Sequence, residues 1–226
     1  MMYQDQIQSH KLFYSFPVAA MSKSSHPGNI LLKNIPWQDL ETILFKRQKN
    51  GETLLAYDNR TLELITPSLE HQEYREILEE FIIALLDLQN INYRCLGSVL
   101  WQRPDLQISL EVDSCFYIQN LSAIEKQLTI SLPENPPPDL VLEIDLTQKS
   151  LSRRSMYARL GIPEVWRCDQ NKLKIYQLQG EDYQQTPRSL VFPEIALESL
   201  PQIIKHNIKS GRVSVRREFQ KWLITI

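Results

Sequence analysis

Apolar residues recur along this chain with two spacings, one typical of helices and one typical of strands. The strongest helical stripe, within residues 69–88, consists of Tyr74, Ile77, Leu78, Phe81, Ile82 and Leu85. A shorter stripe of the same kind predicts a helix that begins at Trp37. Residues 150–161 predict another short helix, which Gly161 closes at its C-terminal cap.

Alternation of apolar and polar residues predicts the strands. Residues 53–65 predict a hairpin, because two apolar runs flank the turn around Asn59. The other segments with a strand pattern are 92–101, 106–118, 139–146, 163–169 and 172–178. Segment 106–118 is long enough for two strands or for one strand with a bulge. The expected order is a helix, three strands, a second helix and further strands.

Composition limits the classes of function. The chain has 226 residues, of which 42% are hydrophobic, and a net charge of -2. A nucleic-acid site would therefore need a local basic patch or metal ions. Three widely spaced cysteines indicate a reducing compartment, and no secretory signal is recognisable at the start. The longest apolar run, FIIALL, is far shorter than the ~20 residues that span a bilayer. We expect a cytoplasmic protein without a membrane segment.

Changes in texture divide the chain into three parts. Residues 1–35 are weakly patterned and are expected to form an N-terminal arm, and residues 36–200 are expected to form one domain. Residues 201–226 predict a basic helical tail, since the stretch from Lys205 to Trp222 holds six Lys or Arg. This tail could follow phosphates or present a solvated face. Phe219 and Trp222 could instead dock it on its own domain or on a second subunit.

Acidic residues lie on the polar faces of two predicted strands. Asp139, Glu143 and Asp145 point to one side of segment 139–146, and Glu111 and Asp113 point to the polar side of the preceding segment. If these strands are neighbours in a sheet, their carboxylates converge and need a neutralising ion such as Mg²⁺. A wet sheet face that carries acids for solubility is the alternative. Because Asp is a poor strand former, its recurrence favours the metal hypothesis.

Residues 137–169 resemble the hallmark stretch of the Uma-type family of putative restriction endonucleases, which is abundant in cyanobacteria. The matching features are Pro-Asp before an apolar strand, Glu143, a short helix that contains Tyr157, then Gly161 and the strand PEVW. The combination is fairly specific, although no single piece would be.

Two upstream segments extend this resemblance to about residues 37–200. SLEVDSCFYIQN is similar to the first Pro-Asp strand of the family, with Val112 where proline is usual. TLELITPSLEHQEY is similar to the family's hairpin-to-helix junction, including His71.

The resemblance implies a member of the PD-(D/E)xK nuclease superfamily. It implies an α/β (α+β) fold in which a central mixed sheet is flanked by helices, a restriction-endonuclease-like core. It also implies phosphodiester cleavage that depends on Mg²⁺, with Mn²⁺ as a substitute. Carried over by position, Asp113 and Glu143 would hold the metal, with Asp139 close by.

The chain departs from the superfamily pattern at the lysine. Asp145 stands at the usual position of that lysine, and Arg153 stands where many relatives supply one from the following helix. Arginine cannot serve as a general base, but it could grip the phosphate and stabilise the transition state. Lys149 is a substitute if its loop turns inward. An exposed helix face is the alternative interpretation of Arg153 and Arg154.

Three further residues are candidates for contacting or positioning the substrate, namely His71, Glu111 and Tyr157. A histidine without function at the start of a helix, and a tyrosine that packs in the core, are the alternatives for two of them. We find no nucleotide-binding loop, serine-hydrolase motif or zinc cluster in the sequence, and hence expect no nucleotide cofactor.

The expected function is that of a Mg²⁺-dependent endonuclease that acts on DNA. Asp113 and Glu143 hold the ion, Asp139 assists, the ion activates the attacking water, and Arg153 or Lys149 meets the phosphate. Cutting both strands of a duplex needs two sites, which favours a homodimer. An inactive nuclease-like module that binds DNA or regulates is the alternative, motivated by Arg153. A glycosidase with paired carboxylates is a third hypothesis, but no acid with a raised pKa is evident.

Overall fold

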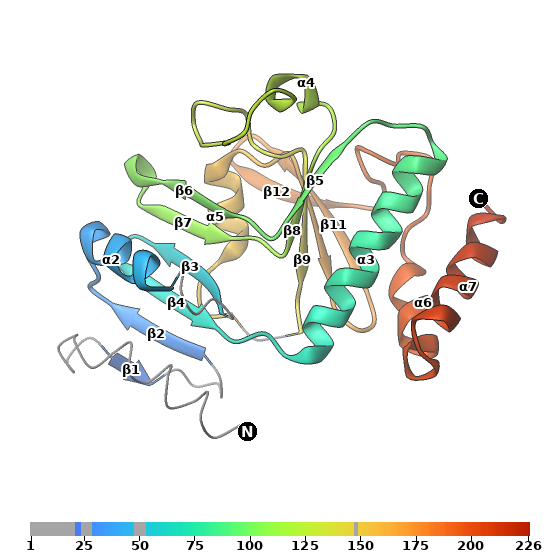
Figure 1. The fold of residues 1–226 in the computed structure, drawn as a ribbon, viewed down its shortest axis with the longest axis horizontal. Helices are drawn as coiled ribbons and strands as arrows, with labels where there is room; N and C mark the ends of the chain where they lie inside the picture. The colour runs from blue at the N-terminus through green and yellow to red at the C-terminus, as the bar shows by residue number, and fades with distance from the viewer. Residues whose placement is uncertain (1–20, 24–28, 48–52, 147–148) are drawn as a thin grey trace.

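The computed structural model describes residues 21–23, 29–47, 53–146 and 149–226, and these form two six-stranded sheets (Figure 1). We call them sheet A, with the strand order β1-β2-β4-β3-β7-β6, and sheet B, with the order β12-β11-β10-β9-β8-β5. In the described part of the chain, no helix is both long and apolar enough to cross a membrane.

Sheet A is antiparallel and comes mostly from the N-terminal half. Its strands are β1 (Met21–Lys23), β2 (Asn29–Lys33), β3 (Leu54–Asp58), β4 (Thr61–Ile65), β6 (Leu100–Arg103) and β7 (Ile108–Glu111). The predicted hairpin is β3–β4, and Asn59 and Arg60 make its turn with positive φ angles of 43° and 68°. Helix α2 (Trp37–Arg47) packs Leu40 and Ile43 against one face of this sheet. The short 3-10 helix η2 (Pro104–Leu106) joins β6 to β7.

Sheet B is mixed, because β9 and β10 run parallel and its other neighbours are antiparallel. Its strands are β5 (Arg94–Gly97), β8 (Ser114–Tyr117), β9 (Leu140–Ile144), β10 (Glu164–Cys168), β11 (Leu173–Gln179) and β12 (Asp182–Thr186). One face packs against α3 (Leu69–Leu88), α6 (Leu200–Asn207) and α7 (Arg212–Leu223). The other face packs against α5 (Arg153–Leu160) and residues of sheet A. The sequence prediction of a mixed sheet flanked by helices is confirmed.

The long helix α3 has the predicted bounds and the predicted apolar stripe. The Ser68 side chain caps it by accepting a hydrogen bond of 3.1 Å from the His71 backbone N–H. All six stripe residues are buried in the core between α3 and sheet B. The order of elements in sheet B also matches the sequence, since α3 is followed by β5, β8 and β9, then by α5, β10 and β11.

The long alternating segment 106–118 forms two strands that belong to different sheets. β7 pairs in sheet A and β8 pairs in sheet B, and the chain passes between the sheets at Val112 and Asp113. The preceding segment 92–101 divides in the same way into β5 and β6. Alternation could not show this division, because each half keeps the same period of two.

The C-terminal residues form two helices that pack on α3. Phe219 of α7 stacks on Phe81 with ring centroids 3.8 Å apart, and Arg212 forms ion pairs of 2.6 and 3.1 Å with Glu76 and Glu80. The tail is therefore docked on its own chain. The 3-10 helix η3 (Ile208–Ser210) links α6 to α7, and the short α4 (Leu121–Ile124) follows β8.

The predicted N-terminal arm lies mostly outside the described residues. Within it, Asn29–Lys33 form β2, which pairs with β4. Residues 29–33 thus belong to a sheet, which their weak pattern did not indicate. The division of the chain into an arm, a central domain and a tail stays a prediction.

Candidate active site

Asp113 and Glu143 lie close to each other along the neighbouring strands β8 and β9. Asp113 directly precedes β8, and the antiparallel register pairs Ser114 with Leu142. Asp113 lies one residue beyond this register, and its carboxylate contacts the backbone of Ile144, the residue that follows Glu143. Both acids are buried, with exposed fractions of 4% and 1%. The structure thus brings together the two acids predicted to hold a metal.

Asp113 is held by one side chain and one backbone amide. Its Oδ1 lies 2.8 Å from His71 Nε2, and its Oδ2 accepts a 2.7 Å hydrogen bond from the Ile144 N–H. Burial alone would raise the pKa of Asp113, but the hydrogen bond from His71 and the charge of Lys149 outweigh it and lower the pKa. Because an ionised carboxylate only accepts hydrogen bonds, His71 Nε2 carries a proton and orients Asp113.

Glu143 lies between two cations. Its Oε1 accepts a 2.6 Å hydrogen bond from Lys149 Nζ, and its Oε2 lies 3.7 Å from Arg167 Nε. Oε2 is buried and has no hydrogen-bond partner. A buried carboxylate oxygen without a donor is costly, which is typical of a site that binds a further group.

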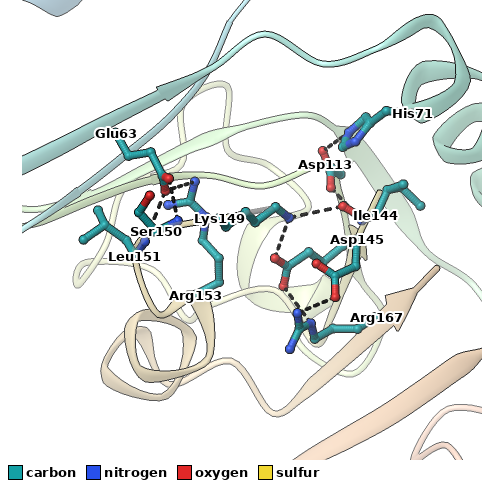
Figure 2. A network of polar contacts seen from close by, with 11 residues as sticks. Glu63, His71, Asp113, Ile144, Asp145, Lys149, Ser150, Leu151, Arg153 and Arg167 are labelled. Carbon is teal, nitrogen blue, oxygen red and sulfur yellow. Dashed lines mark hydrogen bonds and ion pairs between the residues drawn. The ribbon is translucent and has the colours of Figure 1, made fainter. Parts of the chain in front are cut away.

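Lys149 connects the two acids through the backbone of Ile144. Its Nζ donates to the Ile144 carbonyl oxygen at 3.2 Å as well as to Glu143, while the Ile144 N–H donates to Asp113. Figure 2 shows the ammonium reaching into the space between these groups. The loop therefore does turn Lys149 inward, and it places a positive charge between a carboxylate oxygen and a carbonyl oxygen.

Arg153 lies apart from the two acids and is bound to Glu63 of β4. The two residues form an ion pair of 3.3 Å and are 6% and 0% exposed, and Arg153 Nη1 is buried without a partner. Glu63 also accepts hydrogen bonds from the backbone N–H groups of Ser150 and Leu151. Figure 2 shows this group on the other side of Lys149 from Asp113. The exposed-face interpretation of Arg153 is wrong, whereas Arg154 is exposed.

The other acids of the two segments do not join the pair. Glu111 belongs to β7 and faces α2, where it pairs with Arg47 and accepts from the Leu55 N–H. Asp139 precedes the far end of β9 and accepts hydrogen bonds of 2.6 and 2.9 Å from the backbone amides of Ile118 and Asn120. Asp145 is partly exposed and pairs with Arg167 at 2.6 Å. The predicted convergence of these further acids is therefore not observed.

Tyr157 of α5 is buried on the same side of sheet B as Glu143. Burial, followed by the charges of Glu143 and Asp113, raises its pKa well above the usual value. A phenol in this position is neutral and closes the site from the helix side. The wet-face alternative for β9 is excluded, because every residue from Leu140 to Ile144 is buried.

Sequence reasoning missed Glu63 and Arg167. Glu63 alternates with the apolar Leu62 and Leu64 and faces away from them, which is a signal that it enters another part of the core. Arg167 interrupts the apolar run between Trp166 and Cys168 and pairs in register with Glu143. Neither residue's partner is near in sequence, so the contacts themselves could not be foreseen.

The described residues contain no group of three or more His, Cys, Asp or Glu side chains placed to hold a metal ion. Mg²⁺ usually retains several waters and takes only one or two protein carboxylates. The pair Asp113 and Glu143, with the Ile144 carbonyl oxygen, matches this sparse pattern of ligands better than it matches an all-protein cage.

The model of a protein family described as Uma2, putative restriction endonuclease, matches residues 37–207. A crystal structure of a putative nuclease of family DUF820 from Anabaena variabilis is similar over 64% of this chain and 86% of that chain, with 17% identity and a TM-score of 0.45. No curated protein matches this chain significantly.

Proposed function

This chain belongs to the Uma2 family of putative restriction endonucleases, and from this premise we propose that it is a metal-dependent nuclease that cleaves DNA. The observation that carries the proposal is the buried pair Asp113 and Glu143, which the Ile144 backbone and the Lys149 ammonium connect. An acid pair with an adjacent cation is suited to bind a metal ion and a phosphate together.

The ligands present fit Mg²⁺, with Mn²⁺ as a substitute. Glu143 Oε2 is buried and accepts no hydrogen bond, and each hydrogen-bonded oxygen of Asp113 keeps a further lone pair. The position of Lys149 supports the proposal, since its charge is stabilised among the same oxygens. When bound, the ion would activate water and stabilise the charge that grows on the phosphate. Asp113, Glu143 and the Ile144 carbonyl would hold it.

Lys149 takes the role of the superfamily lysine in this proposal. An ammonium has three N–H donors, of which Glu143 Oε1 and the Ile144 carbonyl engage two. The third can donate to a phosphate oxygen and stabilise its charge. His71 acts through Asp113 by fixing the carboxylate orientation. Arg153 is engaged by Glu63 and positions the loop of Lys149.

The substrate and the oligomeric state are part of the same proposal. DNA is proposed as the substrate, and a homodimer would provide two sites for a duplex. A cytoplasmic location stays a prediction from the cysteine pattern. Asp139 and Glu111 are not proposed to contact the metal, since their contacts hold other parts of the fold. Tyr157 is not proposed as a ligand either, because its buried phenol is neutral.

Cleavage of supercoiled plasmid in Mg²⁺ tests the proposal. Asp113→Asn and Glu143→Gln should each lower the rate about 10³-fold, because a metal contributes several kcal/mol to such reactions. Asp105→Asn is the matched control, since Asp105 lies in an exposed pair with Arg103. Equal cleavage by all three variants would contradict the proposal.

Calorimetric titration with Mn²⁺ separates the nuclease from the inactive module. The wild-type protein should take up the ion, and Asp113→Asn and Glu143→Gln should not. Absence of both uptake and cleavage in the wild-type protein would favour a module that binds DNA without cutting it.

A further inference from the structure

Three cations lie next to the candidate active site on one face of sheet B. Arg167 of β10 is opposite Glu143 in the parallel pair β9–β10, and it is opposite Lys174 in the antiparallel pair β10–β11. Directly opposite residues share a face. Glu143, Arg167 and Lys174 therefore form a line across three strands.

Arg154 of α5 joins this line through Tyr176. Tyr176 is two residues beyond Lys174 and so faces the same way. The guanidinium of Arg154 lies 5.3 Å from the centre of the Tyr176 ring, and Tyr176 is diagonal to Arg167 in the register of β10 and β11. We call Arg154, Arg167 and Lys174 the basic row.

Two of the three cations in the basic row carry charge that no acid of the described residues neutralises. Arg154 and Lys174 are exposed, and within the described residues neither forms an ion pair with an acid. Arg167 is 28% exposed and contacts Asp145 and Glu143, so its outer side is open to solvent. A guanidinium that stacks on a ring is held in place with its N–H groups free to bind an anion.

Three cations of the C-terminal tail differ from Arg154 and Lys174 in this respect. Arg212 and Arg216 are neutralised by Glu76 and Glu80 of α3. Lys221 pairs with Glu218 of its own helix. The tail is the most basic stretch in the sequence, but acids of α3 neutralise two of its arginines in ion pairs that dock the tail on that helix.

We propose that the basic row binds the phosphate backbone of a nucleic acid and leads the strand to Asp113 and Glu143. The inference rests on the proposed function and adds the surface by which the substrate enters. Lys and Arg that displace counterions bind phosphates without regard to sequence. Two strand spacings, roughly 10 Å, separate Glu143 from Lys174, so one oligonucleotide can contact both.

The test is the salt dependence of binding to a short fluorescein-labelled DNA duplex, measured by anisotropy in Ca²⁺, with the probe checked on a gel for cleavage. One variant removes the row (Arg154→Ala, Arg167→Ala, Lys174→Ala). The matched control removes three exposed tail cations that form no ion pair with described acids (Lys205→Ala, Lys209→Ala, Arg217→Ala). Both variants lose the same net charge, so a long-range field affects them equally.

In the row variant, the plot of log K against log salt concentration should become shallower by about 2 to 3, because each phosphate contact contributes about 0.9 to the steepness of the slope. The tail variant should change it by less than about 1. A double variant, Arg154→Ala with Lys174→Ala, leaves the contacts of Arg167 intact and should lower the slope by about 1 to 2. Thermal melting verifies that each variant is folded.

Equal losses in the two triple variants, a larger loss in the tail variant, or no salt-dependent binding by the wild-type protein would overturn the inference. Plasmid cleavage that is lost in Asp113→Asn would still support the nuclease in those cases. If cleavage fails but the row variant alone loses binding, the inference stands and the catalytic proposal falls.

Discussion

Sheet B buries one glutamate on each of its faces, and the two have different partners. Glu143 lies on the α5 side, between the cations Lys149 and Arg167. Glu164 lies on the α3 side, where Trp166 Nε1 donates to it at 2.7 Å and Ser189 Oγ and the Leu190 N–H also donate. Both are nearly inaccessible to solvent, with exposed fractions of 1% and 0%.

The kinds of donor distinguish a chemical site from a structural one. Neutral donors around Glu164 anchor the loop after β12, and burial raises the pKa of Glu164 although those hydrogen bonds oppose it. Glu143 has permanent cations beside it and one oxygen without a donor. Burial of an acid therefore does not by itself indicate a chemical site, whereas a buried carboxylate oxygen without a hydrogen-bond donor, beside cations, favours one.

The sharpest test of this comparison substitutes the two glutamates in parallel. Glu143→Gln should lower plasmid cleavage about 10³-fold, through the loss of several kcal/mol of metal-assisted stabilisation. Glu164→Gln should leave cleavage unchanged and lower the free energy of unfolding by about 1 to 3 kcal/mol, because buried hydrogen bonds are lost. Urea unfolding and cleavage rates measure both, and a reversed pattern would show that we assigned the two faces wrongly.

Glu63 extends the comparison to a buried ion pair. Glu63→Gln leaves Arg153 buried without its partner and should cost about 3 kcal/mol of unfolding free energy. Asp105→Asn breaks the exposed pair with Arg103 and should cost less than about 1 kcal/mol. Urea unfolding measures the difference. Equal costs would mean that burial of the Glu63–Arg153 pair does not raise the cost of breaking it.

Lys149 allows the cation beside Glu143 to be removed by itself. Lys149→Met should lower cleavage about 10²-fold, yet it should tighten the binding of Mn²⁺, because the ammonium no longer competes for Glu143 Oε1 and the Ile144 carbonyl. Calorimetry measures the affinity, with exposed Lys172→Met as the control. Weaker Mn²⁺ binding in Lys149→Met would contradict the competition.

The smallest effect is expected in the pH dependence of stability. The pKa of Glu164 is raised above its usual value of 4.5, so between that value and the raised one the folded state binds more protons than the unfolded state. The contribution of Glu164 to stability is then full below pH 4.5 and falls as pH rises through the raised pKa. Glu164→Gln should lack this decline. An identical pH profile in wild type and variant would contradict the raised pKa.

The sequence predicted much of the fold because its strongest signals are local. The apolar stripe of α3, the turn between β3 and β4, and Gly161 at the end of α5, with φ of 74°, each depend on residues a few positions apart. The sequence analysis missed β12, because its sequence DYQQT is mostly polar and lacks an apolar alternation. The strand is stabilised by its pairing with β11, which the sequence pattern does not show.

The pairing of Asp113 with Glu143 could be predicted, but their other neighbours could not. Strand alternation put both acids on polar faces, and neighbouring strands then brought them together. Glu63 and Arg167 reach the site from other strands, and no local pattern encodes those contacts. The same limit applies to Glu111, which alternation groups with Asp113 although the change of sheet at Val112 separates them.

The chain crosses from sheet A to sheet B at Val112. The candidate active site therefore depends on sheet A, although neither Asp113 nor Glu143 belongs to that sheet. The Val112 N–H is bound to the Val99 carbonyl at 3.0 Å, and Glu63 of the same sheet secures Ser150 and Leu151. A shortened protein reduced to sheet B and its helices would lose both anchors at once. Trimming this molecule from its N-terminal side through β4 should therefore release the loop of Lys149, whereas removal of β6 and β7 should disturb Asp113, and a minimal active fragment would have to retain both sheets.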